Sequence, residues 1–122
     1  MIKEIAFSAY PSADIAKLAK FYTDVVGLKL TEKYEEDGNM MYAEFKIGDG
    51  YFSLMHHAWM EVAAGTGCGV AFEVDDIEKT IKQLGEHGVK ASAIYDTPVC
   101  RVTNFPDPEG NRVVLHQITV PH

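Results

Sequence analysis

Residues 14–30, DIAKLAKFYTDVVGLKL, decide how the first half of this chain folds. The apolar side chains of this stretch recur at helical spacing: Ile15, Leu18, Ala19, Tyr22 and Val26. Asp14 can cap the start of a helix, and Gly27 can adopt the left-handed backbone conformation that ends one. The stretch therefore predicts an amphipathic helix with one apolar face.

Strand-like segments flank this helix. Residues 2–10, IKEIAFSAY, alternate, with Ile5, Phe7 and Ala9 on one face and Glu4, Ala6, Ser8 and Tyr10 on the other. After the helix come apolar segments at residues 28–34, 40–47 and 51–56, separated by the dipeptides Asp37-Gly38 and Asp49-Gly50. Such dipeptides permit the positive φ angles of tight hairpins. The first half therefore predicts the order βαβββ.

The second half repeats this order. We expect a strand at residues 68–74, then a helix that is capped by Asp75, has Glu78 three residues later and ends at Gly88. Strands near residues 91–95, 99–105 and 112–120 complete the unit.

The two halves also match in their letters. Ala6-Phe7 corresponds to Ala71-Phe72 at an offset of 65, whereas Asp14 corresponds to Asp76 at 62. The difference predicts a three-residue insertion in the first half, at residues 11–13. We therefore expect a single domain over residues 1–122, with modules at 1–57 and 67–122 and an irregular linker at 58–66.

Composition narrows the class of protein. A chain of 122 residues with 47% hydrophobic content suits one globular domain. With 11 basic and 18 acidic residues the formal charge is −7, so a nucleic acid is not expected as a partner. We find neither a charged leader nor an apolar run of about 20 residues, which predicts a cytoplasmic protein without a membrane span. Cys68 and Cys100 lack CxxC spacing and are expected to be reduced thiols.

Three segments, residues 14–30, 69–89 (GVAFEVDDIEKTIKQLGEHGV) and 105–117 (FPDPEGNRVVLHQ), together resemble the vicinal-oxygen-chelate superfamily of glyoxalases, bleomycin resistance proteins and dioxygenases. The resemblance covers nearly the whole chain. It implies an α+β fold in which two βαβββ modules form a cupped, partly open mixed β-sheet barrel, with a ligand site in the cup. It also implies a homodimer.

The resemblance also identifies the positions of possible metal ligands. Metal-dependent members of the family use His or Glu from the first and the fourth strand of each half. The corresponding residues are Ser53 and Val114 on the fourth strands and Gly69 on the second half's first strand. In the first half, counting back from the helix cap gives Phe7, and the internal repeat gives Glu4, which we prefer. These residues predict no metal and no cofactor.

A displaced divalent metal site remains the alternative. Strand alternation places Glu4, His57, Glu73 and His116 on the expected inner face. The structural interpretation is that Glu73 is a carboxylate on the wall of the cup and that His116 is a hydrogen-bonded histidine near a strand end. The residues expected to contact a ligand on this face are Glu4, Ser8, Tyr10, Ser53, Met55, His57, Ala71, Glu73, Val114 and His116.

Three functions are compatible with these residues. The preferred one is metal-independent binding of a small organic molecule, with carboxylates that favour a basic ligand. The second is a lyase, isomerase or dioxygenase that uses a displaced metal, or Glu73 and His116 as general base and acid. The third is a regulatory or partner-binding module that uses edge strands or Trp59 and Met60.

Overall fold

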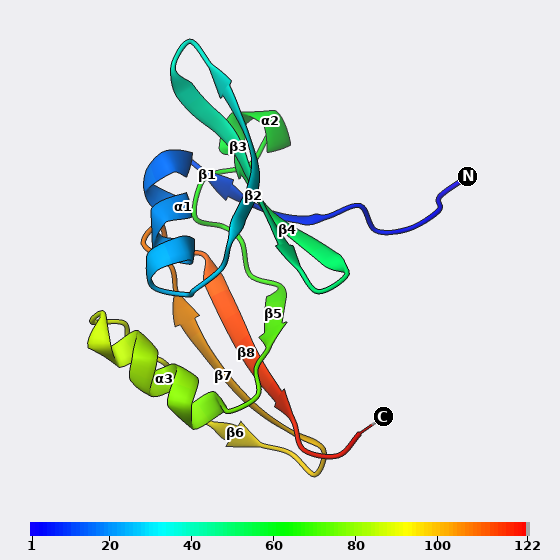
Figure 1. Cartoon of the computed structure of the whole chain (residues 1–122), viewed down its shortest axis with the longest axis vertical. Coiled ribbons are helices and arrows are strands. Elements are labelled where there is room, and N and C mark those ends of the chain that lie inside the picture. The colour runs from blue at the N-terminus through cyan, green and yellow to red at the C-terminus, as the bar shows by residue number, and fades with distance from the viewer. Residues whose placement is uncertain (122) are drawn as a thin grey trace. The chain divides into compact units, whose positions relative to one another are not determined.

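The computed structural model describes residues 1–121 and divides the chain into two compact units, residues 1–67 and the part from residue 68 onward (Figure 1). Each unit contains one four-stranded sheet and one long helix. The α+β class and the βαβββ order of both halves are therefore confirmed. In the described part of the chain, each helix falls short of the length and apolar character needed to cross a membrane.

The first unit contains a mixed sheet. Its elements are β1 (Ser8–Ser12), α1 (Ile15–Asp24), β2 (Leu30–Glu36), β3 (Asn39–Ile47), β4 (Gly50–His56) and a short α2 (His57–Met60). The strand order is β1-β4-β3-β2, in which β1 runs parallel to β4 and the other neighbours are antiparallel. Asp37 and Gly38 both have positive φ at the β2–β3 turn, as predicted.

The helix α1 packs on one face of this sheet through aromatic side chains. Tyr22 of α1 is fully buried, with its ring centroid 5.1 Å from that of Phe52 and 6.1 Å from that of Phe45. We call the sheet face away from the helix the distal face. In the first unit its residues are identified by strand register: Ala9, Tyr42, Glu44, Ser53 and Met55.

The predicted first strand is wrong in two respects. The strand begins only at Ser8, so Glu4 lies outside it and is exposed. Tyr10 pairs with Leu54, is 3% exposed and packs on Phe52, so Tyr10 and Ser8 lie on the helix face rather than beside Ser53. The reason is that both faces of residues 2–10 carry apolar side chains, and alternation alone does not tell which of them a helix covers.

The second unit has the same topology. Its elements are β5 (Val70–Glu73), α3 (Ile77–Glu86), β6 (Tyr95–Asp96), β7 (Cys100–Pro106) and β8 (Arg112–Ile118). The order is β5-β8-β7-β6, with β5 parallel to β8. Val113 and Leu115 are buried with the helix residues Ile77 and Leu84. The distal face carries Ala71, Glu73, Val114 and His116.

Two other segments differ from the prediction. Of the strand expected near 91–95, only Tyr95 belongs to β6, although Ser92 also forms side-chain and backbone hydrogen bonds to β7. The segment 58–66 is not wholly irregular, since α2 includes residues 58–60. The Nδ1 atom of His56 caps α2 by accepting from the backbone N–H of Ala58 at 3.2 Å.

The caps of the two long helices are equivalent. The carboxylate of Asp14 accepts from the N–H of Lys17 at 3.2 Å, and that of Asp76 accepts from the N–H of Lys79 at 3.1 Å. Asp14 is therefore confirmed as a cap, whereas the predicted cap Asp75 is wrong by one residue. The sequence Asp75-Asp76 offers two possible caps, and the second, which directly precedes the first helical residue Ile77, is the one whose side chain accepts from the helix.

This assignment predicts different effects for the two neighbouring aspartates. Changing Asp76→Ala is expected to lower the free energy of unfolding by about 1 kcal/mol, because the N–H of Lys79 loses its acceptor. Changing Asp75→Ala is the matched control and should stay within about 0.5 kcal/mol of the parent chain. Urea denaturation measures both effects, and a larger loss for Asp75→Ala would contradict the assignment.

Candidate functional site

The strand registers align the first strand and the long helix of the two units without a gap. Ala9 pairs with Ser53 in the first unit, and Ala71 pairs with Val114 in the second. The offset of 62 that relates the two helix caps therefore also relates the two first strands. The predicted three-residue insertion is wrong, and Phe7, not the preferred Glu4, is the counterpart of Gly69.

The residues at the four positions expected to carry metal ligands do not fit a resident metal ion. Phe7, Gly69 and Val114 offer no side-chain donor, and Ser53 is a buried neutral hydroxyl. Among residues 1–121, no group of three His, Cys, Asp or Glu side chains is placed to hold a metal.

The distal face of the second unit brings together the two predicted catalytic candidates. Nδ1 of His116 lies 2.5 Å from Oε1 of Glu73, and Oε2 of Glu73 accepts from the backbone N–H of Ile118 at 2.7 Å. The two residues are in-register neighbours on β5 and β8, and both side chains are partly exposed. The carboxylate fixes the orientation of the imidazole and leaves Nε2 for a ligand or a proton.

The distal face of the first unit carries a hydrogen-bonded group that sequence reasoning missed. The phenol of Tyr42 donates to Oε1 of Glu44 at 2.6 Å and lies 2.8 Å from the hydroxyl of Ser53. Burial, and then the hydrogen bond to Glu44, raise the pKa of Tyr42, so the phenol stays neutral. The available signal was the alternation of residues 40–47, which puts 42 and 44 on one face.

Two other predicted ligand residues lie outside the strands. His57 begins α2, its ring stacks on that of His56 at 4.8 Å, and its Nδ1 lies 3.3 Å from the carbonyl oxygen of Val62. Glu4 precedes β1. Strand alternation therefore does not place either residue on a sheet face, and the displaced metal site that included them loses its geometric basis.

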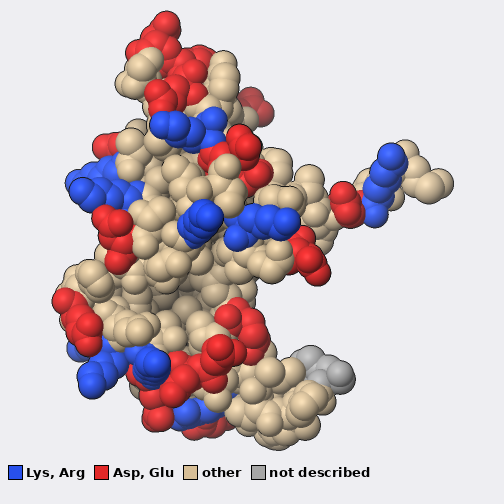
Figure 2. Space-filling view, viewed as in Figure 1, with Lys and Arg blue, Asp and Glu red and all other residues tan. Residues whose placement is uncertain are grey.

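A cleft lies beside the long helix of each unit. A cleft of about 440 Å³ lies in the first unit between the start of α1, the β2–β3 turn and His56. A cleft of about 470 Å³ lies beside α3 and includes Glu73. Of the predicted ligand-contacting residues, Glu73 alone lines either cleft. Acidic side chains gather over the β2–β3 hairpin (Figure 2).

Comparison with known proteins gives consistent matches along the chain. A model of the Glyoxalase/Bleomycin resistance protein/Dioxygenase superfamily matches residues 4–115. The uncharacterized protein YaeR of Escherichia coli (strain K12) is 28% identical over an aligned length of 125 positions, and the alignment covers 95% of this chain and 97% of that protein.

Two solved structures resemble the whole chain. TnmS3, an antibiotic binding protein from Streptomyces sp. CB03234, has a TM-score of 0.84 and 25% identity over 97% of this chain and 98% of its own. A glyoxalase/bleomycin resistance protein from the same strain has a TM-score of 0.80 and 26% identity over 93% of this chain and 100% of its own.

Proposed function

We propose that this chain, which belongs to the glyoxalase/bleomycin resistance protein/dioxygenase superfamily, binds a small organic molecule without a metal. The proposal treats residues 1–122 as one domain of that family. TnmS3, which is described as an antibiotic binding protein, supports a binding role, since it is similar to this chain along nearly all of its length.

One observation carries the proposal. At the four positions where metal-dependent relatives hold their ion, this chain has Phe7, Ser53, Gly69 and Val114. An aromatic ring, a hydroxyl, a space without a side chain and an aliphatic group suit contact with an organic molecule better than coordination of a cation.

Each unit offers ligand contacts on its own distal face. In the first unit the accessible one is Met55, since Ser53 beside it is fully buried, and in the second they are Ala71, Glu73, Val114 and His116. Apolar groups supply contact area, and the Glu73–His116 pair supplies polar specificity.

Thermal unfolding in the presence of a small-molecule library tests the proposal. A ligand that binds only the folded chain raises its Tm by mass action. We expect stabilising molecules whose effect is unchanged by a chelator. Binding that disappears with chelator and returns with a divalent ion would contradict the metal-independent proposal.

The carboxylate of Glu73 gives a sharper prediction. Glu73→Gln is expected to weaken the binding of a cationic ligand from that library by roughly 10-fold, because the charged hydrogen-bond acceptor becomes neutral. Glu86→Gln, which removes an exposed carboxylate of α3, is the matched control. Isothermal titration calorimetry measures both affinities, and equal affinity for the parent chain and Glu73→Gln would remove this carboxylate from the site.

A second candidate function is favoured by the Glu73–His116 hydrogen bond itself. A carboxylate that orients an imidazole is the arrangement a general base needs, so a metal-free isomerase or lyase is the alternative. Turnover of a library molecule, lost in His116→Ala while its binding persists, would favour the enzyme over the binding protein.

We also propose a homodimer, which is consistent with the family and with the position of β2 and β6 at the edges of their sheets. The cytoplasm is the expected compartment.

A further inference from the structure

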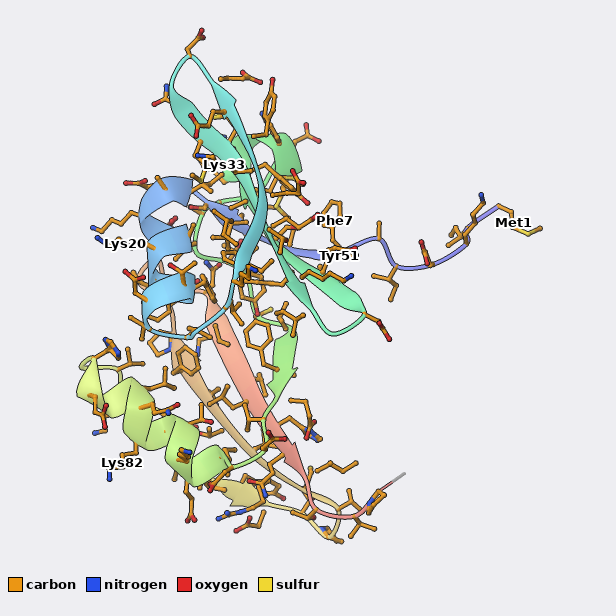
Figure 3. The ribbon with its side chains drawn as sticks, viewed as in Figure 1. Met1, Phe7, Lys20, Lys33, Tyr51 and Lys82 are labelled. Carbon is orange, nitrogen blue, oxygen red and sulfur yellow. The ribbon has the colours of Figure 1, made fainter. Side chains whose placement is uncertain are left out.

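Four aromatic side chains of the first unit form what we call the aromatic row: Phe7, Tyr42, Tyr34 and Trp59. The rings of Phe7 and Tyr42 meet edge to face at 5.9 Å, and those of Tyr34 and Trp59 lie 6.2 Å apart. Tyr34 and Tyr42 are in-register partners on β2 and β3, which joins the two pairs. In Figure 3, Phe7 lies on the side of the sheet away from α1. The row therefore extends along the distal face.

The aromatic row is accessible for contact. Phe7 is 38% exposed, Tyr34 50% and Trp59 46%. Three large rings with this much exposed surface offer aromatic faces on which a flat molecule can stack.

Carboxylates surround the row. Glu32 and Glu44 are paired directly across β2 and β3, an arrangement in which like charges repel each other. The charge of Glu36 and its hydrogen bond to Tyr34 raise the pKa of that phenol. By strand alternation Lys46 shares the face with Glu44, but it lies two residues further along β3, on the side of Glu44 away from Tyr42. The charge beside the aromatic row is therefore negative.

We propose that the aromatic row, together with Glu32 and Glu44, binds a planar aromatic cation. This rests on the proposed function and names the class of ligand that the first unit accepts. Because the planes of Tyr34 and Trp59 are inclined by 44°, a flat ring system stacks on one of them and contacts the other at an angle. Its positive charge lies beside the two glutamates, where it relieves their repulsion. An anion of the same shape meets two negative charges and is rejected.

The test uses two dyes with related rings and opposite charge. Proflavine is a planar cation near neutral pH, and acridine-9-carboxylate is an anion. Trp59 is the chain's one tryptophan, so its fluorescence reports directly on the row. The whole chain is titrated with each dye, and dye anisotropy gives an independent measure of binding. We expect saturable quenching by proflavine with an affinity at least about 10-fold above that of the anion. Equal affinity for both dyes, or quenching that never saturates, would overturn the proposal.

Variants connect the binding to the carboxylates. Glu44→Gln keeps an amide oxygen that can accept from the Tyr42 phenol, and is expected to weaken proflavine binding about 10-fold with little change in Tm. Glu86→Gln on α3 is the matched charge control and should bind proflavine like the parent chain. Should the thermal stability of Glu44→Gln fall, Glu32→Gln gives the same test on the neighbouring strand. Parent-like affinity in a folded glutamate variant would also overturn the proposal.

Two further outcomes separate the possible failures. If proflavine does not bind but library molecules still stabilise the chain through Glu73, this inference fails and the proposed function stands. If no molecule of either kind binds, both fail. A dye affinity that falls as the protein concentration rises would identify a second copy of the chain as the occupant of the row, and would likewise overturn the proposal.

Discussion

Replacing Phe45 by alanine is expected to lower the free energy of unfolding by about 3–5 kcal/mol, as for other large buried aromatic side chains. Phe45 is 0% exposed and lies on the helix face of the first sheet, where its ring stacks on Phe52 at 6.1 Å and contacts Tyr22 of α1. Removing it leaves a cavity between helix and sheet that neighbouring rings cannot fill. Urea denaturation followed by circular dichroism measures the loss.

Phe7, which directly precedes β1 and lies on the side of the sheet away from α1, provides the matched control. Its ring contacts Tyr42 but is 38% exposed, so Phe7→Ala should lower the free energy of unfolding by less than about 1 kcal/mol. A similar loss for both variants would contradict the assignment of the helix face and the distal face.

The second large effect is expected at Asp107, in the turn between β7 and β8. Its carboxylate accepts from the backbone N–H groups of Glu109 and Asn111, each at 3.0 Å, and from the side-chain amide of Asn111 at 2.8 Å. Asn111 is fully buried. Asp107→Ala is expected to lower the free energy of unfolding by about 3 kcal/mol or more, because buried donors lose their acceptor.

The same denaturation measurement checks this prediction, with Asp107→Asn as its control. An asparagine keeps one acceptor oxygen, so it should recover part of the loss. If Asp107→Ala and Asp107→Asn were as stable as the parent chain, these hydrogen bonds would not be what holds the turn.

The parts of the fold that sequence reasoning predicted well are those decided by strong local chemistry. The start of α1 was predicted because Asp14 precedes a clear helical pattern, and the β2–β3 turn because Asp37-Gly38 tolerates positive φ. The same reasoning placed the cap of α3 one residue too early, since two adjacent aspartates are chemically equal until the helix position is known.

The first strand could not be predicted at the same level. Its faces are both partly apolar, so the orientation depends on which one α1 covers, a tertiary contact that the letters do not contain. The letter match of Ala6-Phe7 with Ala71-Phe72 then supported an insertion that is absent. A two-residue match carries little weight against strand register.

The grouping of candidate residues on one sheet face was predicted for the second unit and missed in part for the first. Ala71, Glu73, Val114 and His116 lie on one face because β5 and β8 alternate regularly and pair in register. That Glu73 and His116 form a hydrogen bond follows from this pairing, which spans 43 positions in the chain. Tyr42 and Glu44 were missed although alternation puts both on one face of β3, whereas the contact of Tyr42 with Ser53 depends on a strand register that sequence alone does not fix.

The pairing of each first strand with the last strand of its unit has a consequence for how the chain folds during synthesis. The β2–β3 and β3–β4 hairpins close over short loops and can form as soon as they leave the ribosome, whereas β1 must wait until residue 56 has emerged. The opening segment of each unit is thus the last to join its sheet. Until then its apolar residues remain exposed to chaperones and to other nascent chains.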